Sequence, residues 1–327
     1  MKNINKLNEL LECAGHYHPH YGDRLATHLP MALIALSNLG ASDEKLTAYF
    51  EKSIQGLEYV NESENIVEIN EVGQYLGDSS KYASYLKYFK QQIAAFGFED
   101  VVKKSLACLL PGIAASAFHA LIRLAYAIEA DNDNEVAVAL AYWCAEFQKF
   151  ELSDAKTGDT LESILAKLAP IGVNHTFSPG IIVDRMNEIS RVLGEGNYRI
   201  QPENMTFSEL RALCVKAFYL KNNFTLLHTV TGCHAFSVIL PYLSDVDSAL
   251  KAFWQSVLVA YLSTGLAFEN RQPAYANHDI DFEAVIAKAL QSDDSHVIKL
   301  VYSCFCEYKK RREKIYFMVA NRAVGNL

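Results

Sequence analysis

Residues 292–307 carry the side chains whose types and spacing point most directly to chemistry. His296 and Lys299 stand three positions apart, so on a helix they share a face. Apolar residues surround Lys299 around the whole turn, and burial lowers the pKa of a lysine because it disfavours the ammonium. A neutral amine can pair with an acid, form a Schiff base, or add carbon dioxide to become a carbamate. A carbamate beside His296 would form a pair of metal ligands; the alternative is a Lys299 side chain that extends to solvent.

Further histidines lie at the start of, or within, apolar segments of helical period. His28 precedes an apolar helix predicted over residues 31–39, and His119 lies in an apolar run that begins after Asp100. His228 and His234 are six positions apart, about 240° around a helix, so on a regular helix they cannot share a face. A single buried histidine is usually a hydrogen-bonded core residue, whereas several histidines and a buried lysine are a typical way to build a site inside a helical bundle.

The elements that would position these residues are helices. The chain has 327 residues, of which 50% are hydrophobic, with only 8 prolines and 16 glycines, and its apolar residues recur at helical spacing. We therefore expect an all-α, multi-helix bundle forming one domain over residues 1–327. The segments 121–126 and 297–302 (LIRLAY and VIKLVY) align position by position and set Arg123 against Lys299, which predicts two repeated halves, about 1–150 and 206–327, around a buried metal site.

Composition and motifs exclude several classes of function. The net charge of −8 argues against nucleic-acid binding, and no apolar run approaches the roughly 18 residues of a membrane span. Seven cysteines without a CxxC motif favour reduced thiols and a cytoplasmic location. No phosphate-binding or dinucleotide-binding glycine motif is present, so the chain shows no visible means of binding NADPH or flavin.

Four segments in this order resemble the questin oxidase-like family: THLPMALIALSNLGA, FHALIRLAYAIE, LLHTVTGCHAFSVILPYL and DDSHVIKLVYSC. The likeness covers roughly residues 16–310. It implies a mononuclear non-haem iron(II) oxygenase that opens a ring of anthraquinone-type polyketides. It also implies an iron site formed by four histidines and a carboxylated lysine, which by motif are His28, His119, His228, His296 and Lys299. His234 stands outside that set, and we expect it to support a ligand or to face the substrate.

The resemblance implies a small aromatic or polyketide-like substrate and O2. We expect aromatic walls from Tyr82, Tyr85, Tyr126 and Tyr302, and Arg123 either to hold a substrate oxygen or to pair with a buried acid. Arg123, His234 and Tyr302 are accordingly the candidate catalytic residues. Two alternatives belong to other classes: a helical protein that binds an apolar ligand without catalysis, and a zinc hydrolase with a carbamylated lysine.

Overall fold

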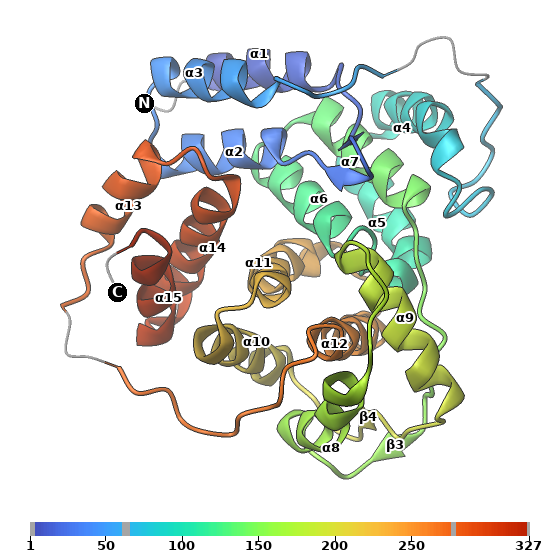
Figure 1. The fold of residues 1–327 in the computed structure, drawn as a ribbon. Helices are drawn as coiled ribbons and strands as arrows, with labels where there is room; N and C mark the ends of the chain where they lie inside the picture. Colours follow the sequence, from blue (N-terminus) through green and yellow to red (C-terminus); the bar gives the residue numbers. More distant parts are fainter. Residues whose placement is uncertain (1–3, 61–65, 276–278, 326–327) are drawn as a thin grey trace.

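The structure is a computed structural model that describes residues 4–60, 66–275 and 279–325. Fifteen α-helices account for most of these residues, and the strands are pairs of two residues each, so the predicted all-α multi-helix fold is confirmed (Figure 1). The helices are α1 (Ile4–Ala14), α2 (Leu29–Leu39), α3 (Asp43–Ser53), α4 (Tyr82–Phe96), α5 (Phe98–Leu109), α6 (His119–Glu129), α7 (Asp133–Ala145), α8 (Leu161–Asn174), α9 (Ile182–Glu195), α10 (Phe207–Lys221), α11 (Phe224–Ile239), α12 (Val246–Leu262), α13 (Phe282–Gln291), α14 (Ser295–Arg311) and α15 (Lys314–Ala323).

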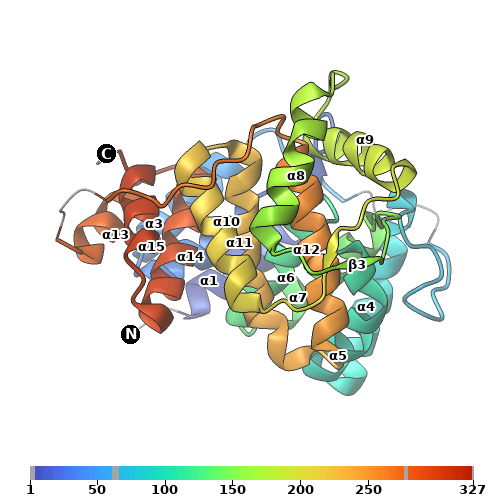
Figure 2. The same cartoon turned by 90° about the horizontal axis from the view of Figure 1, so that it is seen from below.

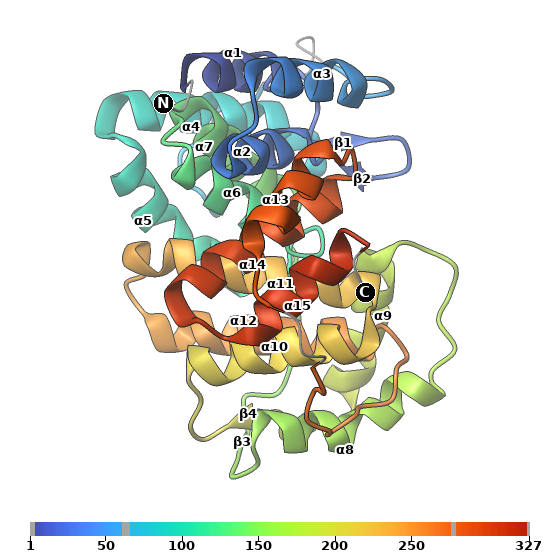
Figure 3. The ribbon, with the colours of Figure 1, turned by 90° about the vertical axis from the view of Figure 1, so that its left-hand side faces the viewer.

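Two short strand pairs are present in the described residues, one a local hairpin and the other between segments distant in sequence. Strands β1 (His20–Tyr21) and β2 (Leu25–Ala26) form an antiparallel hairpin just before α2. Strands β3 (Lys156–Thr157) and β4 (Gln201–Pro202) pair in parallel beside α8, at the opposite end of the molecule from α1 and α3 (Figure 3).

Helix α11 occupies the middle of the fold, where it packs against α6, α10, α12 and α14 (Figures 1 and 2). Its residues are apolar around the whole circumference, which is the pattern of a helix buried on all sides. The apolar length from Phe224 to Tyr242 would reach across a membrane by composition alone, contrary to the expectation from the sequence that no such run exists. Because 67% of that window is buried in the protein, the core position of α11 accounts for its hydropathy.

The helices that carry the candidate site begin and end at residues suited to those positions. Asp294 caps α14 by accepting a hydrogen bond from the backbone N–H of His296. Asn223 caps α11 in the same way. Gly40 ends α2 with φ of 97°, a left-handed conformation that glycine adopts without steric penalty.

One continuous hydrophobic core includes residues from the first helix to the last, from Leu7 to Ala320. Its extent agrees with the expected single domain, which stays a prediction, as does the proposed repeat of the two halves. All seven cysteines are free thiols.

Candidate metal centre

The four histidines of the predicted ligand set line one cavity of about 490 Å³. They come from four separate parts of the chain: His28 precedes α2, His119 begins α6, His228 lies in the first half of α11, and His296 lies in the first turn of α14. The remaining wall is mostly apolar, and it consists of Tyr21, Arg24, Leu25, Ala26, Ser116, Ala117, Gly180, Ile181, Ile182, Val183, Arg185, Phe224 and Thr225.

The imidazole rings contact one another around a closed circuit. The ring centroids of His28 and His119 lie 4.7 Å apart, and those of His119 and His228 also lie 4.7 Å apart. The circuit is completed by His228 to His296 at 5.9 Å and by His296 to His28 at 4.5 Å. The tertiary structure therefore brings together four residues that are spread over more than 260 positions of sequence.

Each histidine is held through its Nδ1 atom. His119 Nδ1 lies 2.5 Å from the Ser116 carbonyl, and His228 Nδ1 lies 3.0 Å from the Phe224 carbonyl. His296 Nδ1 lies 3.2 Å from the Asp294 carboxylate. Because these oxygen atoms only accept hydrogen bonds, Nδ1 carries the proton in all three rings, and each Nε2 is an acceptor with a lone pair.

His28 completes the proton arrangement. Its Nε2 lies 2.8 Å from His119 Nε2, which must accept, so His28 donates from Nε2. His28 Nδ1 then accepts from the Ser295 hydroxyl at 2.8 Å. A hydroxyl group also accepts hydrogen bonds, so the proton of His28 can move to Nδ1 without losing that partner, which would free Nε2 as well.

Two of the Nε2 atoms, those of His228 and His296, are buried without a hydrogen-bond partner. Buried polar atoms normally have partners, so two unpartnered nitrogen atoms on the wall of one cavity indicate a missing ligand. Imidazole nitrogen suits iron, zinc, copper and nickel, and hydrogen-bonded Nδ1 atoms are the usual outer support of metal-bound histidine. The residues present thus fit a metal ion.

As a set, the ligating nitrogen atoms of the four histidines lie further apart than the donor atoms around a bound metal ion. Within the described part of the chain, no three of these histidines place their ligating nitrogen atoms within 4.8 Å of one another. Donor atoms on one ion lie closer than that, so a bound ion would require the rings to approach one another.

Lys299 is buried, with 1% of its surface exposed. It is not a cavity-lining residue, but next to burial, which is the main cause, its charge contributes to the lowered pKa of His28, His119 and His228. Burial lowers the pKa of Lys299 to about 7, against a smaller opposing effect of Asp294. The desolvation that the sequence pattern predicts for this lysine is therefore present in the structure.

The same burial keeps the histidines in the form that binds metal. Desolvation, reinforced by the charge of Lys299, lowers the pKa of His228 to about 3. The pKa values of His28 and His119 are also lowered well below their usual range, mainly by burial. Neutral imidazole, the ligand form, is therefore favoured for these three rings at physiological pH.

The backbone before His119 adopts an uncommon conformation. Ser116, Ala117 and Phe118 have φ values of 50°, 53° and 69°, all in the left-handed region that residues with a Cβ atom rarely occupy. This turn directs the Ser116 carbonyl towards His119 Nδ1 and places Ser116 and Ala117 on the cavity wall. Strained backbone is found preferentially at functional sites, and here it orients one of the four rings.

Arg123 lies away from the cavity. Its guanidinium binds both carboxylate oxygens of Glu135 on α7, at 2.5 Å and 3.1 Å, with both side chains buried. Of the two roles considered for Arg123, the structure favours pairing with a core acid over contact with substrate. In the sequence, this partner of Arg123 is visible only as an acidic residue, Glu135, in the first turn of the following helix.

The expected aromatic walls are also located elsewhere. The hydroxyl of Tyr85 bonds to the backbone of Val72 and Tyr75, whereas Tyr82 and Tyr126 are packed in the core. Tyr302 accepts a hydrogen bond from Asn38 at 3.0 Å. None of these four tyrosines, Tyr302 included, lines the histidine cavity, so the aromatic wall expected from them is wrong; the aromatic residues of its wall, apart from the histidines, are Tyr21 and Phe224.

His234 lies outside the histidine circuit as well. Its Nε2 lies 3.2 Å from the carboxylate of Glu129, and its Nδ1 lies 3.6 Å from that of Glu307. These two carboxylates raise its pKa to about 9 in spite of complete burial. His234 is therefore neither a fifth ring of the centre nor a cavity residue, although it lies on the same helix as His228.

Part of the cavity wall comes from the segment that leads into α9, where no site residue was expected from the sequence. Residues 180–183 and Arg185 lead into α9, and an ion pair of 2.9 Å between Arg24 and Asp184 joins them to the β1–β2 hairpin. Two arginines, Arg24 and Arg185, thus lie on the wall of an otherwise apolar cavity. The sequence pattern predicts a loop around His175 and a helix over residues 182–193, but only the fold shows what these residues face.

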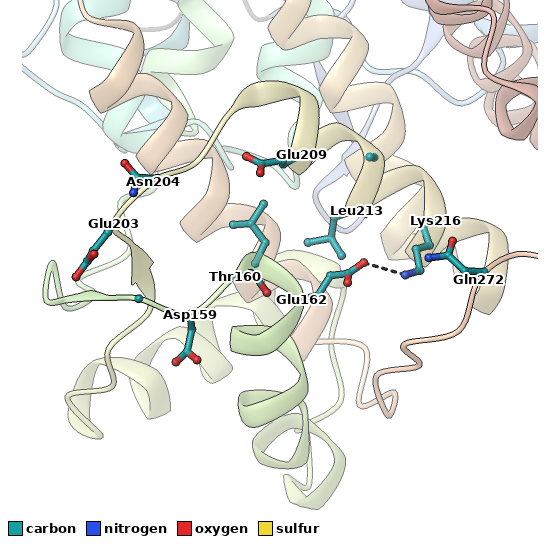
Figure 4. A pocket seen from close by; sticks show the side chains of 12 residues that line it. Asp159, Thr160, Glu162, Glu203, Asn204, Glu209, Leu213, Lys216 and Gln272 are labelled. Atoms are coloured by element: carbon teal, nitrogen blue, oxygen red, sulfur yellow. Dashed lines mark hydrogen bonds and ion pairs between the residues drawn. The ribbon is translucent and has the colours of Figure 1, made fainter.

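A larger cavity of about 600 Å³ lies near α8 and α10 (Figure 4). Its side chains include Asp159, Glu203 and Glu209, and Lys216 pairs with Glu162 at 2.8 Å. None of the predicted site residues lines it. Volume alone would favour this cavity, or one of about 730 Å³ beside α4, over the histidine cavity, but the unpartnered nitrogen atoms and the perturbed pKa values select the histidine cavity.

The chain belongs to the questin oxidase-like family, whose model matches residues 25–304. It is similar to a questin oxidase of Aspergillus terreus (strain NIH 2624 / FGSC A1156), with 23% identity in an alignment 353 residues long, gaps included. The alignment covers 91% of this chain and 79% of the relative. It is also similar to the oxidoreductase AflY of Aspergillus parasiticus, with 22% identity in an alignment 337 residues long, gaps included. This alignment covers 85% of this chain and 67% of the relative. This membership indicates an oxidoreductase.

Proposed function

We propose that this protein is a mononuclear non-haem iron oxygenase that inserts oxygen into, and cleaves, a ring of an aromatic quinone-like polyketide. The single observation that carries the proposal is that His28, His119, His228 and His296 line one apolar cavity, and two of their Nε2 atoms lack any partner. The names of the two relatives support oxidative chemistry on such a substrate.

The protein's own contribution begins with orientation of the rings. The Ser116 and Phe224 carbonyls and the Asp294 carboxylate fix the protons of three rings on Nδ1. The Nε2 lone pairs of His228 and His296 are available without rearrangement, and that of His119 becomes available when the proton of His28 leaves Nε2. Ser295 allows His28 to adopt the same tautomer. Bound iron(II) would supply O2 activation.

Lys299 is proposed to contribute as a carbamate. Its pKa of about 7 leaves a large fraction of neutral amine, which is the form that reacts with carbon dioxide. The product is an anion that cannot stay buried alone, so it should persist only beside a bound cation. Metal and carbamate should therefore stabilise each other.

The cavity suits a flat aromatic substrate with an ionised oxygen. The Phe224 ring lies 4.6 Å from the His296 ring and 5.1 Å from the His228 ring, so a planar molecule in contact with Phe224 would lie beside the metal ligands. Arg24 and Arg185 on the cavity wall can bind a phenolate. The volume of about 490 Å³ lies within the usual range for a small-molecule site.

Metal analysis tests the centre. Protein loaded anaerobically with iron(II) and then desalted should retain about one iron at the histidine centre, and His119→Ala or His228→Ala should lose most of it while keeping the helical circular dichroism signal. His175→Ala is the matched control, because His175 pairs with Glu188 outside the cavity and should retain iron. Full iron occupancy in both cavity variants would contradict the proposal.

Activity is tested with hydroxyanthraquinones. Iron-loaded protein should consume O2 and give a ring-opened product that contains oxygen from ¹⁸O2. A zinc-only preparation that hydrolyses esters, or an iron-loaded protein that binds the quinone without consuming O2, would favour a different function.

A further inference from the structure

A second cluster of potential ligands lies at the other end of the helices that carry the histidine centre. Glu129, His234 and Cys306 place a carboxylate oxygen, an imidazole nitrogen and a thiol sulfur within 4.8 Å of one another. Among the described residues, no other group of three such side chains meets that distance. We propose that these three residues form a second metal site, for a zinc-class divalent ion, separate from the histidine centre.

The three residues lie on the same three helices as the first centre. Helix α6 runs from His119 to Glu129, α11 passes His228 and then His234, and α14 passes His296 and then Cys306. At 1.5 Å per residue, the second cluster lies about 15 Å, 9 Å and 15 Å further along the respective helices. An ion there would join α6, α11 and α14, which lie side by side in the middle of the fold (Figure 1).

The orientation of His234 favours a ligand role. Its Nε2 faces the Glu129 carboxylate at 3.2 Å, within the cluster, whereas its Nδ1 faces Glu307 at 3.6 Å on the other side. A carboxylate behind the far nitrogen is the usual outer partner of a metal-bound histidine. Glu307 is itself fixed by Arg311 at 3.0 Å and by Arg211 at 3.5 Å, so this support is rigid.

The donor set indicates which ion would bind. Thiolate, imidazole and carboxylate together suit zinc, which takes three protein ligands and a water molecule in open sites. Zinc–ligand bonds of 2.0–2.3 Å place donor atoms about 3.5 Å apart. His234 Nε2 and the Glu129 carboxylate are already 3.2 Å apart, and the Cys306 sulfur lies within 4.8 Å of both ligand atoms, so only a small movement is needed. His234 is fully buried, while Glu129 and Cys306 are only partly buried, so solvent and ions can reach the open side.

Without an ion, the cluster has a different stable arrangement. A protonated His234 between Glu129 and Glu307 satisfies both carboxylates, and Cys306 stays a thiol. The competing interpretation is therefore a buried ion pair without any affinity for metal. The two interpretations differ in whether the Cys306 sulfur contacts a cation.

Cobalt(II) is the probe that distinguishes them. In reduced full-length protein, titration with Co²⁺ should produce a near-ultraviolet thiolate-to-cobalt charge-transfer band that saturates and is removed by Zn²⁺. Cys306→Ser should abolish the band, and Cys108→Ser, at another partly buried thiol, should retain it. Glu307→Gln should weaken Co²⁺ binding about 10–100-fold, the usual effect of losing an outer partner.

The test is independent of the proposed oxygenase function, because none of the histidine-centre residues has sulfur. His228→Ala should lose iron from the first centre and keep the charge-transfer band. Absence of the band at saturating Co²⁺ in wild-type protein with intact helical signal and titratable thiols would overturn the second site. Persistence of the band in Cys306→Ser would overturn it as well.

Discussion

Replacing Lys299 with methionine should stabilise the metal-free protein and abolish the metal centre in the same variant. Methionine has a similar length and no charge, so it fills the buried position without desolvating an ammonium. In the wild type, folding lowers the pKa of this lysine from 10.5 to about 7 because of burial. At 1.36 kcal/mol for each pKa unit, that fall corresponds to a destabilisation of about 5 kcal/mol when the group is fully protonated.

The destabilisation depends on pH in a defined direction. Below pH 7 the lysine is protonated in both states, so the full effect is present. Between pH 7 and 10.5 the unfolded chain holds one more proton than the folded protein, so wild-type stability rises with pH by about 1.4 kcal/mol per unit. The advantage of Lys299→Met should therefore fall from about 5 kcal/mol at pH 6 to about 2 kcal/mol at pH 9.

Urea unfolding at these two pH values measures both quantities. The buffers must contain a chelator and no bicarbonate, since either metal or carbamate would alter the state of the lysine. Lys103→Met, at an exposed position on α5, is the matched control and should change stability by no more than about 0.5 kcal/mol at either pH. The reasoning is refuted if Lys299→Met and the wild type differ by the same amount at pH 6 and pH 9, because the lysine would then reach solvent.

Three further predictions concern residues around the centre. Arg123→Met should destabilise the protein by about 3–5 kcal/mol in thermal or urea unfolding, because it leaves Glu135 buried and unpaired. The double variant Arg123→Met with Glu135→Leu should recover most of that loss, and equal destabilisation in both variants would contradict the pairing. Phe224→Ala should retain iron and raise the Kd for a hydroxyanthraquinone, measured by fluorescence; an unchanged Kd would exclude this wall as the substrate surface. Ala117→Gly should keep or raise Tm, because glycine adopts the left-handed φ of 53° without steric strain, whereas Ala117→Val should lower Tm. A higher Tm for the valine variant than for the glycine variant would contradict strain at this turn.

The helical fold could be predicted because it depends on local information. Apolar period, scarce glycine and proline, and capping residues such as Asp294 all act within a few positions of the chain. The same locality explains why Gly40 could be identified as the end of α2. The unusual environment of Lys299 was also visible, since its apolar neighbours surround it on one helix.

The choice between alternatives depended on long-range contacts. Whether Arg123 met a substrate or an acid was decided by α7 packing against α6, which places Glu135 beside it. Tyr82 and Tyr85 have the spacing of a pocket wall, but α4 packs on α7, away from the cavity. A helical stripe shows that a face is buried and does not show what covers it.

By itself, the sequence determined the helices, the burial of Lys299 and the four histidine motifs. The tertiary structure decided that these histidines share one cavity, that residues 180–185 form part of its wall, and that Glu129, His234 and Cys306 meet further along the same helices. The physical reason is that helix formation follows from neighbours three and four positions apart. A site formed by side chains from several helices exists only when the packing of those helices fixes which faces meet.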